Sequence, residues 1–211
     1  MSASVYLKDR SFIGSKDSCC YLVAKDGLYL RKENAAFRSC VRMGKLSWEN
    51  QAFGNGILDE EEFLEMKLPK ITAKIVDEWV TLGRMVRKAY KSEVLLLLFY
   101  SPITGEFQNK VPAQEVSPSS VRSRECIPAR DGFMLVGTVH THPDKAFHSS
   151  VDQKDEEDSD SLHITIGDLD DILPGFAVSA VVNGKRFPLP PEEVMETVEI
   201  PEEWLKKICM V

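Results

Sequence analysis

The strongest constraint on the fold is an uninterrupted apolar run of seven residues, Val94–Tyr100. Such a run lacks the alternation of a half-buried strand and suits a strand that is covered on both faces. It follows a segment from Ile75 to Tyr90 in which apolar residues recur at helical spacing, which predicts an amphipathic helix. A membrane-spanning helix needs about 20 apolar residues, so the run predicts a buried strand and no membrane span.

The remaining elements of the second part of the chain are predicted from shorter patterns. Phe133–His140 is a second buried strand, and Pro201 begins a short C-terminal helix. Two segments, 117–130 and 144–161, are polar and are expected to be loops. Further strands are expected at 106–116, 162–167, 176–183 and 185–189. The sum is a mixed α/β domain over residues 67–211.

The first 66 residues predict a β-rich N-terminal region. Lys25-Asp26-Gly27 lies between two apolar runs, which is a hairpin signal. A third strand is expected at 37–43, a loop at 50–61 and an extended segment at 65–71. We therefore place a domain boundary between residues 66 and 67.

Composition excludes several classes of protein. The chain has 211 residues, of which 43% are hydrophobic and 28% charged, so it can bury a core. Its net charge of -7 argues against a nucleic-acid-binding surface. We see no secretory signal and expect a cytoplasmic protein. The five cysteines include no CxxC spacing, which favours reduced thiols over disulfides.

The histidines are the first clue to function. All four lie within 24 residues, and His140 and His142 stand two positions apart at the end of a predicted strand. Residues i and i+2 of a strand point to the same side, so both imidazoles can face one metal ion. Asp152 follows ten residues after His142. Two histidines and one carboxylate leave a fourth position for water, which is typical of catalytic zinc.

A hydrolytic zinc site also needs a base and a group that stabilises the oxyanion. Glu93 opens the apolar strand, and a charge there is costly to bury unless it meets a polar partner such as a metal-bound water. Ser149, three residues before Asp152, is a candidate donor to the oxyanion. Other hydrolase and nucleotide-binding motifs (HExxH, GxSxG and GxxxxGK[ST]) are absent.

Together these residues resemble a known family. His140-Thr-His142-Pro143 followed by Ser149-Ser-Val-Asp152 is similar to the His-x-His-Pro and Ser-x-x-Asp motif of the JAMM (MPN+) metalloproteases. Ser92-Glu93-Val94 resembles the segment that carries the family's catalytic glutamate. The resemblance implies an MPN/JAB-like, cytidine-deaminase-like mixed sheet flanked by helices. It also implies that His140, His142 and Asp152 bind Zn2+, that Glu93 is the general base and acid, and that Ser149 stabilises the tetrahedral intermediate.

The family hydrolyses peptide or isopeptide bonds at the C-terminus of ubiquitin or ubiquitin-like proteins. Three further segments (21–27, 68–71 and 162–167) are similar to the PRTRC system protein A group. They also resemble JAMM deconjugases encoded in bacterial operons with E1-like, E2-like and ubiquitin-like proteins. The resemblance thus implies a ubiquitin-like substrate and such operon partners.

The motif departs from the family in one place. Five residues separate Pro143 from Ser149, where the family usually has six. We favour Ser149 in the serine role because it preserves Ser-x-x-Asp, with Ser150 as the alternative and Asp155 as another candidate ligand. Iron or cobalt are alternatives to zinc.

The two remaining histidines and the acidic run have plainer interpretations. His148 is expected to be solvated or to touch substrate, and His163 to be a hydrogen-bonded core residue or to orient a ligand. The run 155–160 is expected to be a solvated loop or to meet a basic partner.

Two other functions remain open. One is a non-catalytic scaffold in which zinc only stabilises the loop and which binds a partner. The other is a peptidase that trims a sulfur-carrier protein by the same chemistry.

Overall fold

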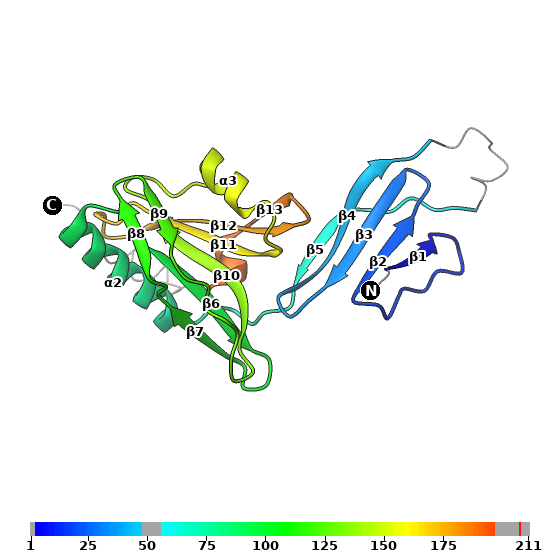
Figure 1. The fold of residues 1–211 in the computed structure, drawn as a ribbon. Helices are drawn as coiled ribbons and strands as arrows, with labels where there is room; N and C mark the ends of the chain where they lie inside the picture. The colour runs from blue at the N-terminus through cyan, green and yellow to red at the C-terminus, as the bar shows by residue number, and fades with distance from the viewer. Residues whose placement is uncertain (1–2, 48–55, 197–206, 208–211) are drawn as a thin grey trace.

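The computed structural model describes residues 3–47, 56–196 and 207, and contains two main β-sheets with helices around the second (Figure 1). The N-terminal sheet has five strands in the order β1-β2-β3-β4-β5. They are β1 (Ser4–Leu7), β2 (Cys19–Val23), β3 (Gly27–Glu33), β4 (Phe37–Lys45) and β5 (Phe63–Met66). The predicted hairpin and third strand are confirmed, and the expected loop at 50–61 lies partly outside the described residues.

The second sheet has six strands in the order β13-β12-β11-β10-β6-β7. β10 and β11 are parallel and every other neighbouring pair is antiparallel, so the sheet is mixed. The bounds are β6 (Leu95–Ser101), β7 (Glu106–Lys110), β10 (Met134–Thr141), β11 (Ser161–Gly167), β12 (Gly175–Val182) and β13 (Lys185–Leu189). The predicted mixed α/β class is confirmed.

The two faces of this sheet differ in chemistry. Because side chains alternate along a strand, Leu162, Ile164 and Ile166 of β11 enter the apolar core, whereas His163 and Thr165 point to the other side. β12 repeats the pattern with Ser179 among apolar neighbours. One face is therefore apolar, and the other carries the buried polar side chains His163, Thr165 and Ser179.

Helix α2 (Ala73–Tyr90) covers the apolar face, as its spacing predicts. Trp79 is fully buried there, and its indole N–H donates to Asn109 Oδ1 at 2.7 Å. The helix begins after Thr72, whose side chain makes no capping bond. A one-turn helix, α4 (Pro191–Val194), contacts β12.

Three predictions about local structure are wrong. Segment 106–116 is two strands, because Pro112 has no N–H to continue the ladder. β8 (Gln114–Ser117) turns instead to pair with β9 (Ser120–Ser123), inside the expected loop 117–130. The expected loop 144–161 contains helix α3 (Ser150–Glu156), on the side of the sheet opposite α2 (Figure 1). The helix expected at Pro201 lies outside the described residues.

The N-terminal sheet packs against the second part of the chain. Phe37 and Val41 belong to the same core cluster as Trp79. Lys32 pairs with Asp160 at 2.6 Å, and Glu62 pairs with Lys185 of β13. Contacts therefore cross the boundary that we place between residues 66 and 67.

Two further sequence expectations concern cysteines and membranes. The four cysteines in the described part of the chain, Cys19, Cys20, Cys40 and Cys126, are free. Among the described residues, no helix is both long enough and apolar enough to cross a membrane.

Candidate metal centre

Three side chains converge above the polar face of the second sheet. His140 is the second-last residue of β10, and His142 follows the strand directly. Asp152 is in the first turn of α3. The Nε2 atoms of the two histidines lie 3.2 Å apart. His140 Nε2 is 3.5 Å from Oδ1 of Asp152, and His142 Nε2 is 3.3 Å from its Oδ2. The sequence-predicted ligands are therefore brought together.

The chemistry and spacing of these donors fit a metal ion. One nitrogen or oxygen from each residue lies within 4.8 Å of the other two. Tetrahedral ligands with bonds of about 2.0–2.1 Å are about 3.4 Å from each other, close to the three separations seen here. The two histidines are buried, which removes competition from bulk water. The group is thus suited to a divalent cation, although the donors alone do not identify which one.

Helix α3 fixes the position of Asp152 through a capping box. Ser149 is the N-cap, and its Oγ accepts the Asp152 backbone N–H at 3.2 Å. The Ser149 backbone N–H donates in return to Asp152 Oδ2 at 2.7 Å. One carboxylate therefore both caps the helix and faces the two histidines.

The electrostatics of the group favour a charged carboxylate. Burial raises the pKa of Asp152, but hydrogen bonds with His140, His142 and Ser149 outweigh burial and hold that pKa well below its usual range. The same hydrogen bond to Asp152 raises the pKa of His142, against the effect of burial. The Asp152 carboxylate is therefore ionised, as a ligand to a cation must be.

Glu93 reaches the centre from the neighbouring strand. The start of β6 pairs with the end of β10, where Leu95 is opposite His140. Val94 N–H donates to Thr141 Oγ1 at 3.0 Å and fixes the segment that carries Glu93. Glu93 is only 6% exposed, and its carboxyl forms no hydrogen bond with any described residue. Burial raises its pKa more than the nearby His142 and His140 lower it.

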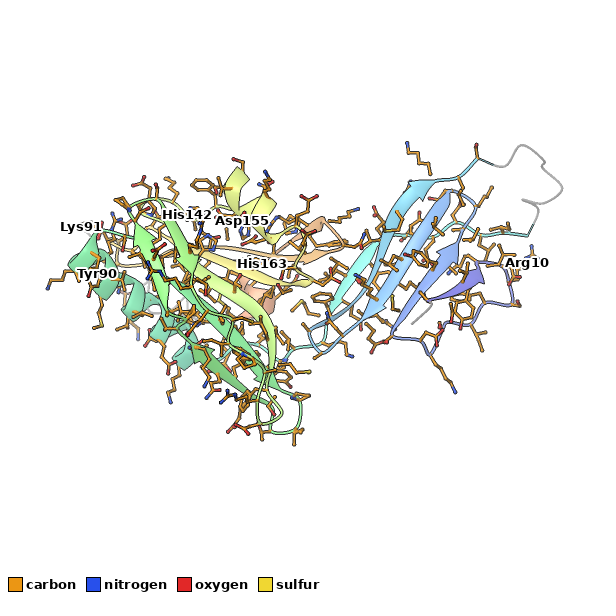
Figure 2. All side chains as sticks on the ribbon, viewed as in Figure 1. Arg10, Tyr90, Lys91, His142, Asp155 and His163 are labelled. Atoms are coloured by element: carbon orange, nitrogen blue, oxygen red, sulfur yellow. The ribbon has the colours of Figure 1, made fainter. Side chains whose placement is uncertain are left out.

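These residues line one open cavity of about 850 Å³. Its walls come from the β8–β9 hairpin, the end of β10, the loop after His142, and α3. Ser149 and Asp155 line it with Glu93, and Ser150 does not. Asp155 is exposed and does not belong to the group of converging ligands. In Figure 2, His142 and Asp155 lie on the side of the sheet that carries α3.

The other two histidines are both held by hydrogen bonds. His163 is 1% exposed and lies 2.9 Å from Thr138 Oγ1 and 3.1 Å from Ser161 Oγ, so it is a buried, hydrogen-bonded residue. It lies outside the apolar core cluster and lines the cavity. The solvated interpretation of His148 is wrong. Its ring lies between Thr165 Oγ1 and Ser179 Oγ, each at 3.0 Å, and burial lowers its pKa to about 4.

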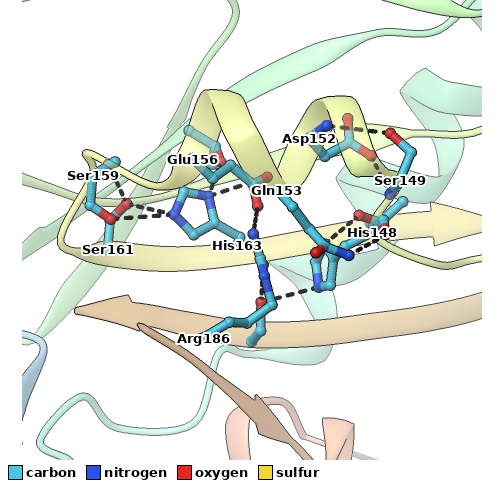
Figure 3. Close-up of polar contacts among 12 residues, drawn as sticks. His148, Ser149, Asp152, Gln153, Glu156, Ser159, Ser161, His163 and Arg186 are labelled. Carbon is cyan, nitrogen blue, oxygen red and sulfur yellow. Dashed lines mark hydrogen bonds and ion pairs between the residues drawn. The ribbon is translucent and has the colours of Figure 1, made fainter. Parts of the chain in front are cut away.

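The acidic run is also not uniformly solvated. Glu156 is 8% exposed and forms ion pairs with Arg186 at 2.5 Å and His163 at 3.3 Å (Figure 3). Sequence reasoning missed Glu156 and Arg186. A signal was present, because Ser149-x-x-Asp152 has the spacing of a capping box and predicts a helix. Glu156 then falls one turn after Asp152, on the same face.

Among known proteins, similarity to this chain is found in solved structures alone. No protein-family model matches the chain, and no curated protein matches it. Among solved structures, the solution structure of protein DSY2949 from Desulfitobacterium hafniense is similar to 56% of this chain and 87% of its own length. The identity is 18% and the TM-score is 0.37.

Proposed function

We propose that this protein is a zinc-dependent peptidase or isopeptidase of the JAMM type, with an MPN/JAB-like catalytic domain. The observation that carries the proposal is the convergence of His140, His142 and Asp152 in a cavity that Glu93 and Ser149 also line. Glu93 is only 6% exposed as a residue, yet it lines the cavity beside the two histidines. A carboxyl that faces the candidate metal from a site of low exposure suits the base of a hydrolytic site.

In this proposal each residue has a distinct task. His140, His142 and Asp152 hold the metal, which when bound supplies a Lewis acid that polarises the scissile carbonyl and acidifies water. Glu93 takes a proton from the attacking water on its carboxylate and delivers it to the leaving nitrogen. Burial raises the pKa of that carboxyl, which makes its ionised form a stronger proton acceptor.

Ser149 is suited to stabilising the oxyanion. Its Oγ accepts the Asp152 N–H, which leaves the hydroxyl hydrogen available to a second partner. That hydrogen donates to the carbonyl oxygen as negative charge develops on it.

The proposed substrate is the C-terminal tail of a ubiquitin-like protein, joined to a further chain or to a lysine side chain. The cavity is bounded on one side by a β-hairpin and on the other by α3, which suits an extended tail. Its lining includes six carboxylates (Glu93, Glu115, Asp144, Asp152, Asp155 and Glu156) and one arginine, Arg122. Asp152 is assigned to the metal and Glu156 is paired with Arg186, which leaves four carboxylates against Arg122. That remaining charge favours a tail with basic residues near the scissile bond. E1-like and E2-like proteins are the expected operon partners.

The decisive experiment uses a ubiquitin-like protein from the same operon with a C-terminal extension. The zinc-loaded protein should release the extension, and a chelator should stop the release. Glu93→Gln should abolish cleavage and leave zinc bound, whereas the exposed Glu106→Gln should behave as wild type. Full activity of Glu93→Gln would refute its role as base.

The same experiment separates the other candidate functions. Stoichiometric zinc and substrate binding without turnover would indicate a scaffold. Cleavage of a sulfur-carrier precursor in preference to the ubiquitin-like fusion would indicate trimming in sulfur transfer.

A further inference from the structure

Helix α3 carries the ligand Asp152 but has no apolar side chain to hold it on the sheet. The helix is seven residues long, and its one buried residue is Glu156. Val151, the single apolar residue of the helix, is 66% exposed. An isolated helix of this length is unstable in water, and most short helices in proteins are stabilised by packing of an apolar face. Polar contacts must therefore supply the attachment here.

Glu156 makes those contacts at the C-terminal end of the helix. Its Oε2 accepts from Arg186 of β13 at 2.5 Å, and its Oε1 lies 3.3 Å from Nδ1 of His163 on β11 (Figure 3). All three residues are largely buried, with exposed side-chain fractions of 10%, 19% and 1%. Breaking such a pair leaves an uncompensated buried charge, so the contact is costly to lose.

Arg186 also connects the two ends of the helix. Its guanidinium donates to Ser179 Oγ, which contacts Nε2 of His148. His148 directly precedes the N-cap residue, and its Nδ1 contacts Thr165 Oγ1, itself 3.3 Å from Nε2 of His140. The arginine thus links the C-terminal end of α3, the residue before its N-terminus, and the neighbourhood of a candidate ligand.

We propose that Glu156, held by Arg186 and His163, is a positioning residue that fixes Asp152 opposite His140 and His142. Asp152 and Glu156 are four residues apart on α3 and lie on the same face of the helix. The ion pairs of Glu156 with the sheet therefore fix the position of Asp152 over the two histidines. The inference rests on the metal site of the proposed function, but it makes no use of catalysis. It states that metal affinity and coordination geometry depend on a carboxylate that is not a ligand.

The test compares Glu156→Gln with the exposed neighbour Glu157→Gln. In competition with a chromogenic chelator, Glu156→Gln should bind Zn2+ about 10- to 100-fold more weakly, and Glu157→Gln should bind as wild type. At saturating Co2+, the visible absorption bands of Glu156→Gln should shift, because the carboxylate of Asp152 approaches the metal differently. A residue that only stabilised the fold would leave the saturated spectrum unchanged.

Variants of Arg186 test the same ion pair from its other side. They also replace the Glu156 variant if that variant does not fold. Arg186→Gln should weaken Zn2+ binding as Glu156→Gln does, and Arg186→Lys should restore most of it. The double variant should lose little more than either single variant, because both remove one interaction. If Glu156→Gln fails to fold, the Arg186→Gln and Arg186→Lys pair carries the test by the same measurements.

Two outcomes overturn the inference, and neither is confused with failure of the proposed function. Unchanged Zn2+ affinity with an unchanged Co2+ spectrum in Glu156→Gln would refute it while leaving the peptidase proposal intact. If the wild type binds no metal, the proposed function fails. Hydrogen exchange of the metal-free protein then tests whether Glu156 holds α3 in place. The Gln153 N–H, bonded to Ser149 O at 2.9 Å, should then exchange faster in Glu156→Gln. Equal exchange in the two proteins would refute the inference.

Discussion

The backbone of Gly167 lies against that of Asp144, so that a β-carbon at residue 167 would be 2.6 Å from the Asp144 carbonyl oxygen. The same β-carbon would be nearer still to the amide nitrogen of Ala146. This close approach lets Asp168 N–H donate to Asp144 O at 2.5 Å, just as His142 N–H donates to Ile166 O at 2.8 Å. The end of β11 is thus a support for the loop that follows the two histidines.

Gly167→Ala is therefore expected to move the loop at 144–146 and to destabilise the protein by about 1–3 kcal/mol. Zn2+ affinity should fall as well, because His142 lies two residues before that loop. Gly44→Ala is the matched control, since a β-carbon there meets no atom within 4 Å. Urea unfolding and chelator competition check both effects, and wild-type values for Gly167→Ala would contradict the close approach.

Loss of a ligand should remove stabilisation by the metal. With free Zn2+ at 100 times its dissociation constant, the wild type should gain about 2.7 kcal/mol of stability. Asp152→Asn keeps the size of the side chain but loses the charge, and we expect most of that gain to disappear. Thermal unfolding with and without a chelator measures the gain. An equal gain in Asp152→Asn and wild type would place the metal elsewhere.

Glu93→Gln should stabilise the metal-free protein at pH 8. Burial raises the pKa of Glu93, so folding disfavours the ionised carboxylate. The ionised group therefore lowers the stability of the wild type at pH values above the raised pKa. This destabilisation disappears as the pH falls through the raised pKa to the pKa of Glu93 in the unfolded chain. The variant should therefore melt on the order of a few degrees higher than wild type at pH 8. At pH 4 this advantage should vanish, and an advantage that persists there would have another cause.

Ser149 has a capping role that is separable from its proposed catalytic role. Ser149→Ala removes the N-cap of α3 and should cost about 1 kcal/mol, along with most of the peptidase activity. Ser149→Thr keeps both the cap and the hydroxyl and should retain both properties. Ser150→Ala is the matched control and also tests the alternative serine. Loss of activity in Ser150→Ala alone would transfer the role to that residue.

His148 should make the metal-free protein acid-sensitive. Its pKa is lowered to about 4 by burial, whereas in the unfolded chain it is about 6.5. As pH falls between these values, the unfolded chain takes up a proton that the folded one does not, so stability is lost.

His148→Leu should be less stable at pH 7, because Thr165 and Ser179 lose a partner. Its further loss between pH 7 and pH 5 should be smaller than in wild type, by on the order of 1–2 kcal/mol. Lys154→Gln, an exposed change on α3, should keep the wild-type pH dependence. Denaturant unfolding at the two pH values provides the comparison. An identical pH dependence in His148→Leu and wild type would exclude His148 as the cause.

The regular elements were predictable where hydrophobic burial alone decides them. Helix α2 and strand β6 follow from apolar periodicity, because each presents its apolar residues to the same core. Helix α3 was not found because it has no apolar face and its one buried residue is charged. The break at Pro112 was missed because residues on both sides of it are in strands, only with different partners.

The ligands of the candidate site were predictable from spacing, since i and i+2 on a strand fix a common side. The residues that hold α3 were not, because Arg186 is 30 residues beyond Glu156 and on another strand. His148 was misjudged for a similar reason. Its partners Thr165 and Ser179 are polar residues inside apolar strands. Whether they lie close enough to bind one histidine depends on the order of the strands in the sheet.

The alternation of side chains across the second sheet has a consequence for how such a protein changes over generations. In β11 the residues that enter the apolar core and those that face the candidate site are different, interleaved residues. A substitution at Thr165 or His163 alters the surroundings of the metal without opening a hole beneath α2. Selection can therefore alter the surroundings of the candidate site while the apolar core beneath α2 stays intact, and the loss is then confined to the polar contacts of His163 and Thr165.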